Sequence, residues 1–305
     1  MSKRQVEITT EVWPLHTPFV IARSSRITTE TIRVKISQSG ASGYGECVPT
    51  ARYGESISSV LQQLNELKEL IESGLSRELL QLFLVAGAAR NALDCALWDL
   101  EAKLADIRVC NLLNVSEPGQ IMTVQTLSID SPESMAEAAN KLKHYPMLKV
   151  KLDRELVLDR LLAVHEGAPQ AQLLVDANES WDLGTLENTL SRIGSLPICM
   201  IEQPLPQGQD EQLSGLCSPV AIGADESCHT SADIEFLARY YDVINIKFDK
   251  CGGLTEALKM LQLARKSDLK VMVGCMLGSS LSMAPALYVA QFAEFVDLDG
   301  PTMLS

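Results

Sequence analysis

The sequence lacks the features that mark several common protein classes. It has no CxxC pair, no basic and apolar leader, and no apolar run long enough to span a bilayer. Its scattered cysteines indicate reduced, mostly buried thiols rather than a disulfide framework or a zinc site. These absences predict a cytoplasmic protein. The eight cysteines are Cys47, Cys95, Cys110, Cys199, Cys217, Cys228, Cys251 and Cys275.

Positive charge is also scarce, with 26 Lys and Arg against 39 Asp and Glu, for a net charge of −13. Such a balance disfavours nucleic acid and anionic membranes as partners. With 46% hydrophobic and 21% charged residues in 305, the composition is that of an ordinary globular protein. The length suits one large barrel with an accessory domain, or two ordinary domains.

Residues 1–118 have the pattern of a small α+β domain. Alternating segments at 5–12 and 31–37 predict antiparallel strands, and the stretch between them, with Pro14, Pro18 and polar residues 23–30, predicts a connecting loop. A glycine-rich segment at 43–47 predicts a turn. Apolar residues at helical spacing around 60–71 and 88–100 predict two helices. We expect the loops near 19–30 and 43–56 to set specificity.

Residues 119–305 alternate short apolar runs with amphipathic segments at 155–166, 185–193, 231–240 and 254–267. This rhythm predicts a (β/α) barrel, although an open doubly wound sheet has the same local pattern. A glycine fingerprint after the first strand is missing, which weakens a dinucleotide-binding interpretation. The predicted strands are 122–127, 148–152, 172–175, 198–201, 220–223, 243–246, 270–273 and 294–296.

Charged residues end most of these strands. The separations from the first to the fifth are 25, 26, 23 and 22 residues, one β/α unit each. In a parallel barrel these ends share one face, where active sites are built. The alternative is that each residue caps the following helix, but capping does not account for the whole set. The residues are Lys151, Asp176, Glu202, Asp225, Lys247 and Asp297.

Three of them, Asp176, Glu202 and Asp225, follow consecutive strands and would repel one another without a cation. An all-oxygen ligand set favours a hard cation, Mg²⁺. Glu226 follows Asp225 directly, so strand alternation predicts that it points to the opposite side. His229 is expected to be a surface or capping residue.

Lysines flank the predicted metal site. Lys149 and Lys151 lie on the same side of the second strand, and Lys247 ends the sixth strand across the barrel. A nearby cation and a second ammonium can lower a lysine pKa from about 10.4 toward about 7–8. Bases on two sides of one carbon, with a metal to hold a developing enediolate, define a proton transfer next to a carboxylate.

Several ordered motifs resemble the muconate-lactonizing-enzyme subgroup of the enolase superfamily. The helix at 89–100 also matches the last helix of that family's capping domain. The resemblance implies a (β/α)₇β barrel with an N-terminal capping domain, Mg²⁺ on Asp176, Glu202 and Asp225, and acid/base roles for Lys151 and Lys247. The motifs are Lys-Val-Lys at 149–151, Val-Asp-Ala-Asn-Glu-Ser-Trp at 175–181, Ile-Glu-Gln-Pro-Leu-Pro at 201–206, Ala-Asp-Glu-Ser at 224–227 and Asn-Ile-Lys-Phe-Asp-Lys-Cys-Gly-Gly at 245–253.

Within that subgroup, Asp297-Leu-Asp299-Gly resembles the motif of dipeptide epimerases. Two carboxylates on one side of a strand end favour a cation, which a dipeptide's α-ammonium provides. Arg26 matches a position that meets the acidic side chain in L-Ala-D/L-Glu epimerases, enzymes associated with cell-wall peptide recycling. Thr126 and Cys275 match substrate-contacting positions. The resemblance therefore implies a dipeptide substrate and Mg²⁺.

Two alternatives stay open. One is an N-acylamino acid racemase or o-succinylbenzoate synthase, whose substrates lack the ammonium. The other is an inactive binding scaffold, because family members continue beyond the Asp-Leu-Asp-Gly-Pro motif whereas this sequence stops at Ser305. A homo-oligomer is possible, and the preferred dipeptide is left open.

Overall fold

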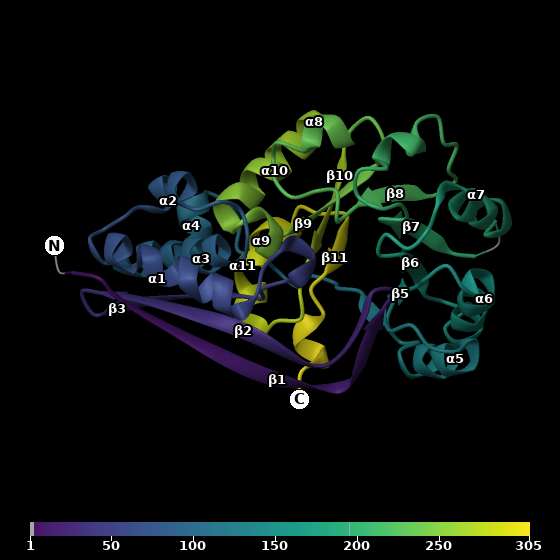
Figure 1. Cartoon of the computed structure of the whole chain (residues 1–305), viewed down its shortest axis with the longest axis horizontal. Coiled ribbons are helices and arrows are strands. Elements are labelled where there is room, and N and C mark those ends of the chain that lie inside the picture. The colour runs from purple at the N-terminus through teal and green to yellow at the C-terminus, as the bar shows by residue number, and fades with distance from the viewer. Residues whose placement is uncertain (1–2, 195) are drawn as a thin grey trace.

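The computed structural model describes residues 3–194 and 196–305. A long antiparallel ribbon opens the fold, formed by β1 (Gln5–Ile21) and β2 (Ser24–Gln38). The ribbon runs along the lower edge of the molecule in Figure 1 and ends beside the barrel. The loop predicted between the two strands is therefore wrong. Pairing resumes from Phe19 after a register shift that begins at Pro14, since a proline nitrogen cannot donate to a ladder.

The glycine-rich segment predicted to be a turn is the third strand, β3 (Ala41–Cys47), so that prediction is wrong too. Its glycines are needed because a helix lies directly on it. A Cβ atom at Gly43 would be 2.1 Å from the carbonyl oxygen of Ala96, and one at Gly45 would be 2.1 Å from that of Ala92. Both contacts belong to α3 (Ala88–Leu104), which packs against β3. Glycine here serves close packing rather than a turn.

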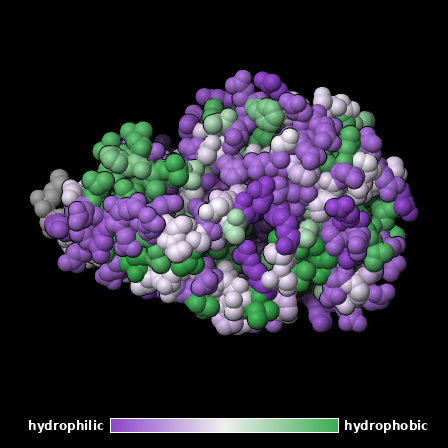
Figure 2. Space-filling model, in the orientation of Figure 1, coloured by the Kyte–Doolittle hydropathy of each residue, from purple (hydrophilic) through white to green (hydrophobic). Residues whose placement is uncertain are grey.

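Of the other helices of this half, α1 (Ile57–Glu72) packs on the same sheet, whereas α2 (Arg77–Phe83) and α4 (Val109–Leu113) pack against α3. A short 3₁₀ turn, η1 (Ala51–Tyr53), precedes them. The two predicted helical stretches correspond to α1 and α3. Hydrophobic side chains gather on the outer surface over α2 in Figure 2, where Leu82 is 81% exposed.

The second half is a parallel barrel, as predicted. Over the described residues its eight strands are ordered along the sheet as they are along the chain, and the amide of Val124 donates to the carbonyl of Val296, which brings the two ends of the sheet together. The strands are β4 (Gln125–Leu127), β5 (Met147–Lys151), β6 (Gln172–Asp176), β7 (Ile198–Glu202), β8 (Ala221–Ala224), β9 (Val243–Lys247), β10 (Lys270–Gly274) and β11 (Phe295–Asp297).

Helices surround this sheet and form its outer layer (Figure 1). The predicted segment 231–240 is helical only at its centre, and three of these helices, α5, α9 and α11, lie outside the segments named from the sequence. The elements are α5 (Pro132–Lys141), α6 (Val157–Gly167), α7 (Leu183–Arg192), η2 (Asp210–Leu213), α8 (Ile234–Leu237), α9 (Phe248–Cys251), α10 (Leu254–Lys266), α11 (Ser280–Ala290) and η3 (Gly300–Met303). Among the described residues, no helix has the length and apolarity needed to cross a membrane.

Buried carboxylates join the two halves. Glu46 of β3 accepts hydrogen bonds from the amide and hydroxyl of Ser279, the residue before α11. Asp94 of α3 accepts from the amide and hydroxyl of Thr255 in the first turn of α10. In the opposite direction, Asp249 of the barrel accepts from the Val48 amide. Each half therefore supplies hydrogen-bond acceptors to buried donors of the other half. These contacts fix the N-terminal half against the barrel.

Candidate functional site

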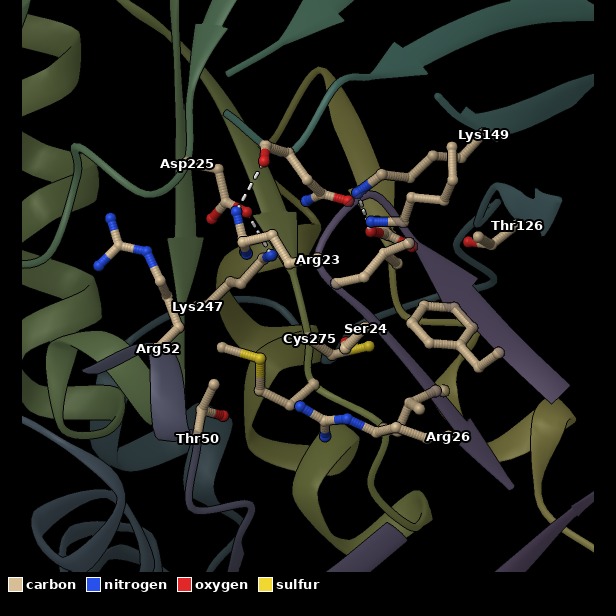
Figure 3. Close-up of a pocket in the computed structure, with 18 of the residues that line it drawn as sticks. Arg23, Ser24, Arg26, Thr50, Arg52, Thr126, Lys149, Asp225, Lys247 and Cys275 are labelled. Atoms are coloured by element: carbon tan, nitrogen blue, oxygen red, sulfur yellow. Dashed lines mark hydrogen bonds and ion pairs between the residues drawn. The ribbon is translucent and has the colours of Figure 1, made fainter. Parts of the chain in front are cut away.

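A cavity of about 410 Å³ lies at the C-terminal ends of the barrel strands. The tip of the β1–β2 ribbon and the loop around η1 complete its wall, so both halves of the chain contribute (Figure 3). Its lining includes all three lysines expected there and both carboxylates predicted after the last strand. Those lining residues are Lys149, Lys151, Lys247, Asp297 and Asp299, with Arg26, Thr126, Asp225 and Cys275 also contributing.

The three predicted metal ligands lie at the ends of neighbouring strands. Asp176 ends β6 and pairs in register with Glu202, which ends β7, while Asp225 follows β8. All three are at most 1% exposed. Asn178 donates its amide to Asp176, and Asn245 donates its side-chain amide to Glu202 at 2.6 Å. Asp176 is thus held by the loop that follows its own strand, and Glu202 by a side chain of β9, two strands away in the sheet.

The predicted lysines lie directly on these carboxylates. Lys151 Nζ is 2.6 Å from Asp176, and Lys247 Nζ is 2.6 Å from Asp225, so the two ammonium groups approach from different strands. Lys149 Nζ lies at 2.7 Å from both Glu202 and Asp297, which links the metal-ligand strands to the last strand. The structure brings the whole predicted set together.

The charges of this cluster shift its pKa values strongly. Burial opposes ionisation of Asp176, but Lys151 and Lys149 outweigh it and lower the pKa of Asp176 below its usual range. Burial would lower the pKa of Lys247, yet the carboxylate of Asp225 raises it overall. The expected lowering of a lysine pKa does not arise from the protein charges alone. It requires a further cation that competes for these carboxylates.

The carboxylate cluster fits a metal ion by its chemistry. In the described part of the chain no three His, Cys, Asp or Glu side chains are already gathered in a metal-binding geometry. Lysine ammonium groups contact the acids instead. Burial, reinforced by Asp176, nevertheless raises the pKa of Glu202 to about 8. Its Oε2 atom faces the Lys149 ammonium at 2.7 Å, but that one ammonium is shared with Asp176 and Asp297. The protein's own cations leave Glu202 undercompensated, and an oxygen-preferring divalent cation would correct that.

The last strand presents two buried carboxylates to the cavity. Asp297 is paired with Lys149, whereas Asp299 accepts the amide of Thr126 at 2.7 Å. Burial, followed by the charge of Asp297, raises the pKa of Asp299 to about 7. Cys275 lines the same wall beside them. A cationic substrate group at this position would stabilise both carboxylates.

The arginines of the cavity differ in their partners. Arg26, on β2, has no ion-pair or hydrogen-bond partner for its guanidinium among the described residues, and it reaches into the lower part of the cavity in Figure 3. Arg23 and Arg52 are instead bound to carboxylates of the barrel. Arg26 is therefore the guanidinium left to meet an anion in the cavity.

Sequence reasoning missed several residues of the site. Lys250, only 3% exposed, donates to the Oδ1 atom of Asp225, whereas Lys247 donates to its Oδ2 atom. Glu226 was predicted to point away, which is wrong: β8 ends at Ala224, so strand alternation no longer applies, and Glu226 lines the cavity. Spacing could have suggested Lys250, since it lies one helical turn after Lys247. His229 is half-buried with its ring against Tyr53, at 4.8 Å between centroids.

Comparison with known proteins agrees with this architecture. The fold and site are those of a parallel barrel protein with buried carboxylates and lysines at the C-terminal strand ends. Residues 3–114 match the family described as mandelate racemase / muconate lactonizing enzyme, N-terminal domain, and residues 133–298 match enolase C-terminal domain-like. The chain belongs to the mandelate racemase / muconate lactonizing enzyme group of the enolase superfamily, as the sequence motifs predicted.

Two curated relatives are similar over most of their length. An L-Ala-D/L-Glu epimerase of Escherichia coli K12 is 45% identical over 304 residues, which cover 99% of this chain and 95% of the relative. An N-acetyl-D-glutamate racemase of a Pseudoalteromonas species is 46% identical over 266 residues, which cover 86% of this chain and 84% of the relative.

Two solved structures superpose closely. An enolase family member from Agrobacterium tumefaciens, described with bound sodium and L-Ala-L-Glu, has a TM-score of 0.96 at 43% identity, covering 99% of this chain and 93% of that one. A dipeptide epimerase from Enterococcus faecalis, complexed with Mg and L-Leu-L-Tyr, has a TM-score of 0.93 at 28% identity, covering 100% and 92%.

Proposed function

We propose that this protein is a Mg²⁺-dependent dipeptide epimerase that acts on L-Ala-D/L-Glu, an isomerase. The observation that carries the proposal is the arrangement of the cavity. Its lining holds Arg26, whose guanidinium has no acidic partner in the described part of the chain, together with two carboxylates, Asp297 and Asp299, and three lysines. A zwitterionic dipeptide with an acidic second residue complements those charges. The similarity to the Escherichia coli epimerase supports the same substrate.

Asp176, Glu202 and Asp225 would hold the metal ion, since they supply three carboxylates from successive strands. When bound, Mg²⁺ supplies positive charge where the substrate carboxylate gains electron density, and it offsets the pKa-raising effect of the acids on the lysines. Lys149 would share Asp176 and Glu202 with the ion and keep its contact with Asp297. Its role is to balance charge between the metal site and the ammonium site.

Lys151 and Lys247 would move the proton. They come from β5 and β9 and contact different acids, Asp176 and Asp225. A substrate α-carbon placed between them presents one face to each. In its neutral form one lysine removes the α-proton, and the other, as an ammonium, donates a proton to the opposite face, which inverts the centre.

The substrate's ends are assigned by charge. Asp297 and Asp299 would accept the α-ammonium, and Arg26 would bind the side-chain carboxylate of the glutamate residue. Thr126 and Cys275 line the rim and would contact the chain between these ends. Because the L-Ala-Glu dipeptide occurs in cell-wall peptides, we place the enzyme in their recycling. The free cysteines support a cytoplasmic location.

The direct test is to incubate the purified protein with Mg²⁺ and L-Ala-L-Glu in D₂O. We expect deuterium at the α-carbon of the glutamate residue, followed by formation of L-Ala-D-Glu, detected by mass spectrometry and NMR. Asp297→Asn should reduce turnover of the free dipeptide strongly. A protein that exchanges no α-proton in any member of a dipeptide library would refute the proposal and support a binding scaffold.

A second candidate is a racemase of N-acylated glutamate, the class of the Pseudoalteromonas relative. One contact favours it: Asp297 already has a cation, Lys149, at 2.7 Å, so part of the acidic wall is neutralised without a substrate ammonium. N-acetyl-L-glutamate and L-Ala-L-Glu should be compared at equal concentration. A higher kcat/KM for the acetylated compound would replace the dipeptide assignment and leave the metal and lysine assignments intact.

A further inference from the structure

The tip of the β1–β2 ribbon is attached to the barrel on two sides of the cavity. On one side, the amide of Val20 donates to the hydroxyl of Ser128, and the amide of Ile129 donates to the carbonyl of Val20. These contacts join the tip to the segment after β4. Among the cavity-lining residues at the tip, Phe19 and Arg26 are paired across the ribbon. The placement of the tip therefore sets the position of Arg26.

On the other side the attachment depends on Arg23, at the turn of the ribbon. Its Nη1 atom donates to the carbonyl of Asn178 at 2.7 Å and to Glu179 at 2.8 Å, and its Nη2 atom donates to Glu226 at 2.7 Å. These acceptors lie two and three residues after Asp176 and one residue after Asp225. Arg23 thus joins the tip to the segments that follow two of the carboxylate strands.

A second arginine converges on the same carboxylate. Arg52, in the loop that contains η1, binds Glu179 through both oxygens, at 2.7 Å from Nε and 2.6 Å from Nη2. The amide of Gln207 also donates to Glu179. One glutamate therefore connects both specificity loops to the barrel, and such bidentate pairs fix orientation as well as distance.

The backbone at this glutamate is in an unusual conformation. Asn178 and Glu179 have φ values of 43° and 67°, in the left-handed region, where residues with a Cβ atom are uncommon. Two such residues in succession persist only where surrounding contacts hold them. The amide of Glu179 donates to the carbonyl of Gln203, and its side chain binds both arginines. The conformation presents Glu179 toward the loops.

We propose that Arg23, Arg52 and Glu179, together with Glu226, form a latch that holds the specificity loops closed over the cavity. Arg23 is a positioning residue: it acts by placing Arg26, and Glu226 serves it as an acceptor rather than joining the carboxylates of the metal site. The effect on turnover rests on the proposed epimerase function. The existence of the latch rests on the contacts in this structure and does not depend on that function.

The latch is suited to opening. The side chains of Arg23 and Arg52 are 33% and 32% exposed, whereas those of Glu179 and Glu226 are 9% and 1% exposed. Ion pairs with one solvated partner are weakened by salt. The ribbon tip and the loop around η1 form part of the cavity wall, so we expect the arginines to leave their acceptors and return as substrate enters and product leaves.

The test compares Arg23→Ala and Arg52→Ala with a matched control, Arg33→Ala. Arg33 lies on β2 and pairs with Glu11 of β1, outside the cavity lining. Hydrogen–deuterium exchange of residues 19–27, without substrate, should be faster by about tenfold or more in Arg23→Ala, as expected for losing contacts to a buried acid. Arg33→Ala should match the wild type there, and Arg23→Lys should fall between them.

Kinetics provide the second readout. With L-Ala-L-Glu, Arg23→Ala should raise KM by about tenfold or more while changing kcat much less, because the lysines and carboxylates are untouched. Unchanged exchange at the tip in both Arg23→Ala and Arg52→Ala would overturn the latch. If the wild type turns over no dipeptide, the epimerase proposal fails, and the exchange comparison still decides whether the latch exists.

Discussion

The sharpest prediction concerns Arg26, because its guanidinium is the cavity cation without an acidic partner among the described residues. Arg26→Ala should weaken the use of L-Ala-L-Glu and leave L-Ala-L-Gln and L-Ala-L-Leu nearly unaffected. The reason is that glutamate alone among these second residues has a negatively charged side chain. A side chain that recognises charge should discriminate by charge, not by size.

The size of the effect follows from the exposure of the site. Removing one partner of a fully buried ion pair costs about 2–5 kcal/mol, whereas an exposed pair contributes about 0–1 kcal/mol. Arg26 is half-buried and lines the cavity wall. We therefore expect about 2–3 kcal/mol, which corresponds to roughly a 30- to 150-fold loss in kcat/KM for the acidic dipeptide.

The assay is loss of the α-proton NMR signal in D₂O with Mg²⁺ present, measured as initial rates for the three dipeptides. Arg26→Lys should retain part of the preference, because it keeps a cation without the forked geometry. An equal fall for all three dipeptides in Arg26→Ala would refute the reasoning, since it would mean that Arg26 supports the ribbon rather than reads the substrate. Arg33→Ala controls for the loss of a charge on β2.

Three further predictions test the chemistry and the attachment of the two halves. Lys151→Ala and Lys247→Ala should each lower epimerisation by at least about a hundredfold, while each keeps deuterium exchange into opposite epimers in D₂O; near-normal epimerisation by both would contradict the two-base mechanism. EDTA should abolish activity and Mg²⁺ should restore it, and Glu202→Gln should lower Mg²⁺ affinity by calorimetry with little change in Tm; full activity without metal would exclude the metal site. Burial raises the pKa of Asp249 to about 7, so the wild type should lose up to about 4 kcal/mol of stability as pH rises from about 4 to about 7. Asp249→Asn should remove that loss in urea unfolding, whereas an identical pH dependence in both proteins would show that Asp249 does not titrate there.

The barrel strands could be predicted because parallel strands buried on both faces appear as continuous apolar runs. A charged residue at the end of such a run is conspicuous, which is why Asp176 and Lys247 could be identified from spacing alone. The ribbon was harder, since its distal part is polar, contains prolines and resembles a loop. The strand β3 was hidden by glycines whose reason, the approach of α3, is a contact distant in sequence.

The residues of the site could be predicted from the sequence more readily than the contacts between them. Arg23 and Glu226 are 203 residues apart, and no local pattern links them. The direction of Glu226 could not be inferred because alternation holds only within a strand, and β8 ends before it. Lys149 was placed on the correct side, but its contact with Asp297 depends on barrel closure, which brings β5 near β11 through the short β4.

The buried carboxylates between the halves have a consequence for how the chain folds. α10 begins after Gly253, which has no side chain to cap the helix, and Asp94 from α3 accepts the Thr255 amide instead. A side chain at Gly253 would collide with Asp94, because a Cβ atom there would lie 2.6 Å from its carboxylate oxygen. The N-terminal half therefore supplies the N-terminal cap of a barrel helix. Denaturant should unfold both halves in one cooperative transition, and a barrel expressed alone should have a frayed α10.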